Sequence, residues 1–165
     1  MFPLMRLFVS VLLTLLTLLL SFPALAGQQG ELPPEAALLK VYFDVNIGIG
    51  QKLEARLRLI NTTYDQLVEQ GYQPQVIIGF RGPASFFVTK GEGYVEQMDL
   101  VFKNKIAQWL TLFTNKGIRL EQCRIAAGLI GIETDAFRPE VVLVDNGYVE
   151  MFVDQHQGLS AIPLD

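Results

Sequence analysis

The sequence predicts an α/β protein, a three-layer α/β/α sandwich around a mostly parallel sheet of about five strands. Short, nearly continuous apolar segments rich in Val and Ile alternate along the chain with amphipathic helical segments. Apolar runs of this kind are typical of parallel strands that are covered by helices on both faces. Glycines follow most of the predicted helices and strands, and no internal repeat or heptad pattern is present.

The chain begins with the three parts of a secretory signal. Arg6 supplies the positive start, an apolar stretch of about 14 residues follows, and Ala24 and Ala26 occupy the −3 and −1 positions of a cleavage site. A membrane-spanning helix needs ~20 apolar residues. We therefore expect residues 1–26 to be a signal peptide cleaved after Ala26, with an uncleaved anchor as the alternative. The protein is expected to be exported, periplasmic or secreted, with no stable membrane span after cleavage.

A flexible Gly- and Pro-rich leader is predicted for residues 27–37, followed by a single domain over residues 38–165. The first elements are expected to be a strand (38–45), a helix (52–70), a strand (75–80) and a helical turn (84–88). The first helix is inferred from apolar residues spaced three and four apart, which place one face toward the core. These residues are Leu53, Leu57, Ile60, Tyr64, Leu67 and Val68.

The second half of the domain continues the same alternation. The predicted elements are a helix (97–115), a strand (118–122), a short helix (125–130), a strand (141–144), a helix (149–157) and a strand (159–164). The helix over 97–115 is expected to turn seven apolar residues inward: Met98, Val101, Phe102, Ile106, Trp109, Leu110 and Phe113. Lys103, Asn104 and Lys105 are expected mainly on its other side. The last helix is expected to bury Val149, Phe152 and Val153.

Composition and motifs argue against several classes of function. The chain has 17 acidic and 13 basic residues without a basic cluster, so nucleic-acid binding is not expected. One cysteine and one histidine, His156, cannot form a metal-ligand cluster, and no metal site is expected. Gly48-Ile49-Gly50 lacks the third glycine of a dinucleotide-binding loop, because residue 53 is Leu. No G-x-S-x-G motif occurs, and no cofactor is expected.

In a parallel α/β sheet, ligands bind beyond the carboxyl ends of the strands. The polar residues that follow the predicted strands are Asp44, Asn46, Arg81, Cys123, Asp145 and Asn146. Cys123 lies between a strand and a short helix, where backbone amides favour a thiolate, and Arg124 adds a positive charge nearby. A buried, inert cysteine is the alternative, because free cysteines are among the most buried residues.

Three segments resemble the DsrE/TusD-type sulfur-relay proteins of the DsrE/DsrF-like family. They are Cys123-x-x-Ala126-Ala127-x-x-x-Gly131, the turn over residues 79–84 after the second strand, and the end of the chain, a helix with a Gln-rich turn (154–158) and a last strand. The likeness covers residues 38–164. It implies a parallel α/β/α fold, oligomeric assembly, and a cysteine that accepts sulfur as a persulfide. By position, Cys123 alone inherits that role.

The favoured function is therefore an exported sulfur-relay protein that accepts sulfane sulfur on Cys123, a sulfurtransferase without a cofactor. Its partners would be further copies of the chain and a protein that donates or accepts sulfur. Arg81 is a candidate substrate-binding residue for an anionic sulfur species, or else a surface arginine on a turn. The alternative is a non-catalytic, oligomeric α/β binding module of the cell envelope, in which Cys123 is structural.

Overall fold

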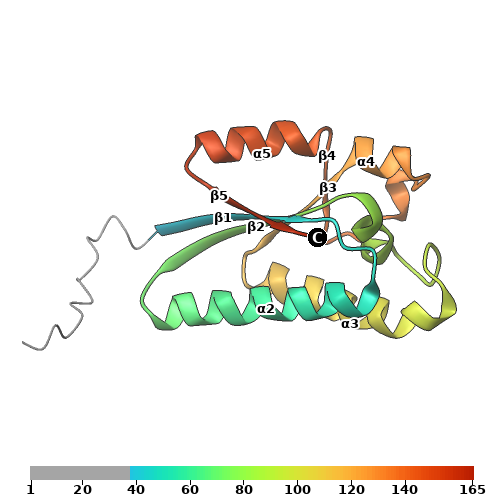
Figure 1. Ribbon diagram of the computed structural model, residues 1–165, viewed down its shortest axis with the longest axis horizontal. Coiled ribbons are helices and arrows are strands. Elements are labelled where there is room, and N and C mark those ends of the chain that lie inside the picture. The colour runs from blue at the N-terminus through green and yellow to red at the C-terminus, as the bar shows by residue number, and fades with distance from the viewer. Residues whose placement is uncertain (1–37) are drawn as a thin grey trace, which may run out of the picture. The chain divides into compact units, whose positions relative to one another are not determined.

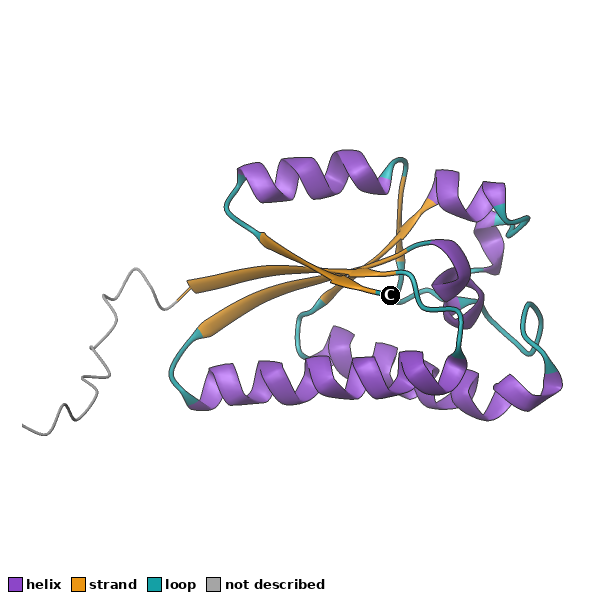
Figure 2. Cartoon of the chain, in the orientation of Figure 1, coloured by secondary structure: helices purple, strands orange, loops and turns teal. Residues whose placement is uncertain are grey.

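The computed structural model describes residues 38–165, so the predicted signal peptide (1–26) and leader (27–37) lie outside the described residues. The fold is the predicted α/β/α sandwich: a five-stranded sheet lies between one helical layer of α2 and α3 and another of α4 and α5 (Figures 1 and 2). The α-helices are α2 (Gly50–Glu69), α3 (Leu100–Asn115), α4 (Arg124–Leu129) and α5 (Gly147–His156). The 3-10 turns are η2 (Gly82–Val88), η3 (Gln97–Asp99) and η4 (Thr134–Ala136).

The sheet has the strand order β4-β3-β2-β1-β5, and every pair of neighbours is parallel. The strands are β1 (Leu38–Val45), β2 (Gln73–Phe80), β3 (Arg119–Cys123), β4 (Val142–Val144) and β5 (Ser160–Leu164). Each strand prediction is confirmed to within two residues at either end. Because all five strands are parallel, their carboxyl ends meet at one edge, which positions the candidate site.

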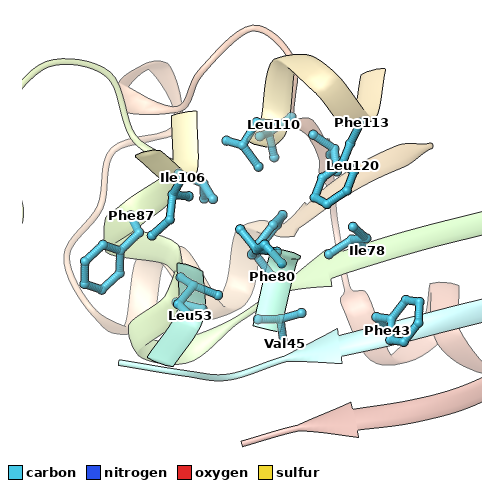
Figure 3. Packing of buried hydrophobic residues seen from close by; sticks show 14 of the residues in the cluster. Phe43, Val45, Leu53, Ile78, Phe80, Phe87, Ile106, Leu110, Phe113 and Leu120 are labelled. Carbon is cyan, nitrogen blue, oxygen red and sulfur yellow. The ribbon is translucent and has the colours of Figure 1, made fainter. Parts of the chain in front are cut away.

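The main hydrophobic core lies between the sheet and the layer formed by α2 and α3. Strand side chains alternate between the faces, and those facing this layer include Val45, Ile78, Phe80 and Leu120. They pack against buried residues of both helices and of η2, as Figure 3 shows: Leu53, Phe87, Ile106, Leu110 and Phe113. The predicted inner face of α2 is confirmed at Leu53, Leu57 and Ile60, whereas Val68, in its last turn, is exposed.

The opposite face of the sheet, under α4 and α5, has a much smaller apolar cluster. Tyr42, Ile77 and Leu159 are buried there, with Met151 of α5 packed against them. The prediction that α5 buries Val149, Phe152 and Val153 is wrong, because these side chains are 52%, 68% and 47% exposed. Met151 and Asp154 lie on the other side of the helix, and Asp154 Oδ2 is buried. The helix therefore meets a partly polar sheet face and leaves its most apolar stripe outside.

Helix α3 also departs from its expected pattern. The first three residues of the predicted helix, including the exposed Met98, form η3 instead. In α3 itself Val101 is exposed, whereas Lys103, expected mainly on the outer side, is buried. Its ammonium group donates hydrogen bonds to Thr89 Oγ1 at 2.7 Å and to the carbonyl of Gly93. Lys103 thereby ties the loop after η2 to the helix. No helix within residues 38–165 is both long and apolar enough to cross a membrane.

Candidate functional site

A pocket of about 250 Å³ opens at the carboxyl edge of the sheet, on the face covered by α4 and α5. Its polar side chains come from four strands or the loops that follow them, namely Tyr42 and Asp44 of β1, Arg81 after β2, Glu121 and Cys123 of β3, and Asn146 after β4. Its apolar walls come mainly from the two covering helices and include Ile125, Ala126, Leu129 and Met151. The edge predicted from the parallel sheet therefore holds a pocket.

Cys123 is the last residue of β3 and the N-cap of α4, as its place in the sequence predicts. Its side chain is a partly buried free thiol on the pocket wall. The Ala126 amide donates a hydrogen bond to Cys123 Sγ at 3.4 Å. This contact is the N-terminal amide contact that the sequence predicts, and a negatively charged sulfur would strengthen it. The thiol is therefore not fully buried.

Arg81 lines the same pocket, but its guanidinium is engaged by Asp44. Arg81 Nε and Nη2 donate to the two carboxylate oxygens of Asp44 at 2.6 and 2.8 Å. This hydrogen bond to Asp44 raises the pKa of Arg81 further, so the charge is permanent. With its amide oriented to satisfy both contacts, Asn46 accepts from Arg81 Nη1 and donates to the Arg81 carbonyl, each at 3.2 Å. Arg81 is therefore neither a free surface arginine nor a free cation.

The two residues expected after β4 have separate positions. Asn146 lines the pocket and caps α5, because its side-chain oxygen accepts from the Tyr148 amide at 3.1 Å. Asp145 does not line the pocket; its side chain is 97% exposed and pairs with Arg124 at 3.2 Å. The positive charge expected beside Cys123 is thus matched by Asp145 at the surface.

Glu121 is the site residue that motif reasoning missed. It lies two residues before Cys123 on the same face of β3, and its side chain is 2% exposed on the pocket wall. Oε1 pairs with Arg119 Nε at 2.6 Å, whereas Oε2 is buried without a hydrogen-bond partner among residues 38–165. Burial raises the pKa of Glu121 above the ordinary carboxyl value, although the charge of Arg119 opposes this shift. The available signal was a carboxylate at the i−2 position of a strand cysteine.

Tyr42 completes the polar part of the pocket. Its hydroxyl lies over Gly79 of β2, where an added Cβ would come within 1.9 Å of the oxygen. Gly79 is therefore required to let the tyrosine ring lie against the sheet. Burial raises the pKa of Tyr42, as do the nearby carboxylates of Glu121 and Asp44, so the hydroxyl keeps its proton.

The residues at this edge bring together a thiol, a buried carboxyl group and hydrogen-bond donors. Residues 38–165 hold no group of three or more His, Cys, Asp and Glu side chains placed to bind a metal ion. His156 is the last residue of α5 and does not line the pocket. Gly48 and Ile49 lie in the loop after β1, and Gly50 begins α2.

No protein-family model and no curated protein matches this chain. Solved structures do. One is the protein of unknown function MTH1491 from Methanobacterium thermoautotrophicum, 13% identical, with a TM-score of 0.52, covering 77% of this chain and 98% of that chain. Another is the ychN protein from E. coli, 16% identical, with a TM-score of 0.52, covering 76% of this chain and 99% of that chain. Both have the DsrE-like fold, and at these identities the likeness shows that this chain shares that fold.

Proposed function

We propose that this protein accepts sulfane sulfur on Cys123 as a persulfide and passes it to an acceptor. The observation that carries the proposal is the position of the thiol: partly exposed, on the wall of a pocket at the carboxyl edge of the sheet. The DsrE-like fold of the similar structures agrees with a sulfur-relay role. Thiolate attack on a sulfane sulfur needs no cofactor.

The charge and the apolar walls of the pocket favour one class of sulfur donor over another. The Arg81 charge is balanced by Asp44, and several walls are apolar, so a small anion such as thiosulfate finds no unpaired cation among the lining residues. A sulfane sulfur carried on an organic thiol fits better, because its apolar part can contact Ile125, Leu129 and Met151. The expectation that Arg81 binds an anionic sulfur species therefore changes: we assign Arg81 to holding the pocket edge.

The direct test is incubation of the protein, starting at residue 27, with a low-molecular-weight persulfide, followed by intact mass measurement. Transfer adds one sulfur atom, about 32 Da, to the wild type and nothing to Cys123→Ser. The adduct should disappear with dithiothreitol and move to an added acceptor thiol. An equal adduct on Cys123→Ser, or none on the wild type, would contradict the proposal.

A binding module with a structural cysteine is the alternative, and a thiol titration separates the two. The sulfur-relay proposal expects Cys123 to react with a neutral thiol reagent in the native protein. A thiol that reacts only after unfolding would instead favour the binding module. The partial exposure of Cys123 supports the first outcome.

We further propose that the chain self-associates through the outer face of α4 and α5. Six apolar side chains are exposed there, each at least 47%: Ile125, Leu129, Tyr148, Val149, Phe152 and Val153. Ile125, Leu129 and Tyr148 also line the pocket, so a second copy seated on this face would shelter Cys123. Sedimentation should show an oligomer at micromolar concentration that weakens with Phe152→Ser but not with Leu59→Ser, a matched exposed apolar residue on α2. A monomeric wild type would contradict this proposal.

Export remains a proposal that rests on residues 1–26. It predicts that the full chain, expressed in a bacterium, yields a periplasmic or secreted product whose first residue is Gly27. Such a location would also explain why a reactive thiol needs shelter, because exposed thiols in oxidising compartments are oxidised or paired. A cell-bound product that retains residues 1–26 would instead indicate an anchor.

A further inference from the structure

We propose that Glu121 is the proton-transfer residue of the Cys123 pocket: its carboxylate takes the thiol proton and returns it to the departing sulfur. This inference rests on the proposed sulfur acceptance by Cys123 and names the group that serves it. Glu121 and Cys123 project from the same face of β3, two residues apart, and both line the one pocket.

The burial of Glu121 is the observation that calls for a function. A buried carboxyl oxygen without a hydrogen-bond partner is unfavourable, and folded proteins rarely keep one. Glu121 Oε2 is such an atom, on a side chain that is 98% shielded from solvent. Arg119 contacts only Oε1, and its own side chain is half exposed. Oε2 thus has no partner from residues 38–165, on a side chain that lines the pocket.

The surroundings of Glu121 raise the pKa of its carboxyl group, mainly because the side chain is buried. Arg119 favours ionisation, whereas burial and the carboxylates of Asp154 and Glu150 on α5 oppose it. Across the pocket, Tyr42 remains a neutral donor, and the charge of Asp44 is balanced by Arg81. With its pKa raised, the Glu121 carboxylate is a stronger proton acceptor than an ordinary carboxylate.

The space between the two groups allows the transfer. A pocket of about 250 Å³ accommodates a small thiol compound or several water molecules. We therefore infer that a proton passes between Glu121 and a sulfur atom inside this pocket, which both residues line. Among the residues lining the pocket, the other carboxylate is Asp44, and both of its oxygens are occupied by the bidentate contact with Arg81.

The step balances without any further reactant. The Cys123 thiol gives its proton to the Glu121 carboxylate, and the thiolate attacks the outer sulfur of a persulfide R–S–SH. The new S–S bond forms on Cys123 while the S–S bond of the donor breaks, and the electron pair leaves with R–S⁻. Glu121 then protonates R–S⁻, so Cys123 ends as a persulfide, the donor as R–SH, and Glu121 as it began.

The experiment compares Glu121→Gln with the wild type in two reactions over a range of pH. Glu140→Gln is the matched control, since Glu140 is also a partly buried carboxylate paired with an arginine but lies outside the pocket. For alkylation by iodoacetamide, we expect a two-step pH profile in the wild type and in Glu140→Gln, and a single step in Glu121→Gln. For persulfide uptake at neutral pH, we expect a loss of at least about 100-fold in Glu121→Gln alone.

The two reactions separate this inference from the proposed function. A changed alkylation profile without persulfide uptake in the wild type would refute sulfur acceptance and leave the proton coupling intact. Persulfide uptake with unchanged rate and pH profile in Glu121→Gln would overturn the role of Glu121. If Glu121→Gln does not fold, the carboxyl carbon of Glu121 is titrated by NMR in the wild type and in Cys123→Ser. Its midpoint should move between these two proteins, and an unchanged midpoint would overturn the inference.

Discussion

At the scale of single residues, the Asp44–Arg81 pair sets the charge of the pocket. The guanidinium is 29% and the carboxylate 15% exposed, so both groups are largely removed from water. Paired, they present almost no net charge to Cys123. Without Asp44, the arginine would be an anion-binding group beside the thiol.

Asp44→Asn tests this balance. The variant keeps the shape of the side chain but removes its charge, so Arg81 becomes an unpaired cation on the pocket wall. Cys123 should then react faster with anionic iodoacetate relative to neutral iodoacetamide, by roughly three- to tenfold at low salt. Loss of the paired contact should lower the free energy of unfolding by about 1–2 kcal/mol. An unchanged ratio of the two alkylation rates would contradict the proposal that Asp44 balances the charge of Arg81 at the thiol.

Some residues of the pocket could be predicted from the sequence, and others could not. Cys123, Arg81, Asp44 and Asn146 could be assigned to one edge, because parallel strands bring their carboxyl ends together. That Asp44 engages Arg81 could not be predicted, since it depends on the register between β1 and β2. Glu121 was not predicted as a site residue, because it lies inside a strand and only the residues that follow strands were considered.

At the scale of elements, the first turn of α5 controls access to the thiol. An added Cβ on Gly147 would lie 3.1 Å from Cys123 Cβ and 3.6 Å from Cys123 Sγ. The glycine thus lets the helix begin directly beside the cysteine. A side chain there would narrow the entrance to the sulfur.

Gly147→Ala should therefore slow alkylation and persulfide uptake at Cys123 several-fold while the protein stays folded. Gly128→Ala is the matched control on α4, where an added methyl group meets nothing within 4 Å. That control should leave the thiol rates unchanged and stabilise the protein by about 0.5–1 kcal/mol, because alanine favours a helix. The measurements are the rates of alkylation and persulfide uptake and the melting temperatures of both variants. Equal reaction rates of Cys123 in the two variants would refute the role of Gly147.

Buried Lys103 links helix α3 to the loop after η2, although the apolar pattern of the sequence predicted this lysine on the outer side. Burial lowers the pKa of Lys103, and the charge of Arg138 adds to this effect, yet its ammonium group is satisfied by Thr89 and Gly93. Lys103→Met should leave the Gly93 carbonyl unpaired and lower the free energy of unfolding by about 1–3 kcal/mol. Urea denaturation measures the change, and Lys105→Met, an exposed site, should have no effect. Equal stabilities of the two variants would contradict a tie between α3 and the loop.

The elements themselves were predictable, but their orientation was only partly so. The spacing in α2 identified its buried face, because that helix covers an apolar sheet face. In α5 the same reasoning failed at Val149, Phe152 and Val153, since the sheet face beneath it holds Glu121 and Asp44. Periodicity shows that a helix has an apolar stripe but not whether that stripe meets the sheet or another molecule.

At the scale of the whole molecule, one face of the sheet forms the main core and the other face forms the pocket. The face under α2 and α3 carries the large apolar cluster that stabilises the fold. The face under α4 and α5 has few buried apolar residues and instead holds the pocket, Glu121 and Cys123. The sequence predicted the layers, because they follow from alternation of strands and helices. This division could not be predicted from alternation alone, since nearly continuous apolar strands suit both faces equally.

The buried carboxyl groups on the α4 and α5 side of the sheet should make the free energy of unfolding depend on pH. Burial raises the pKa of both Glu121 and Asp154, so between the ordinary carboxyl pKa and the raised values the native state binds more protons than the unfolded chain. The free energy of unfolding must then fall as pH rises through that window, because the unfolded chain releases those protons first. Glu121→Gln removes one such group. Its stability relative to the wild type should therefore increase from pH 4 to pH 7.

Glu140→Gln should show the opposite trend. Burial alone would raise the pKa of Glu140, but the hydrogen bond and charge of Arg138 outweigh it and lower the pKa. That carboxylate stabilises the native state above the ordinary carboxyl pKa, and this stabilisation is lost as pH falls through the lowered value. The variant should therefore be less stable than the wild type at pH 7, with the difference shrinking toward acid pH. Urea denaturation of the three proteins at several pH values measures both differences, and parallel trends in the two variants would mean that folding lowers the pKa of Glu121 instead of raising it.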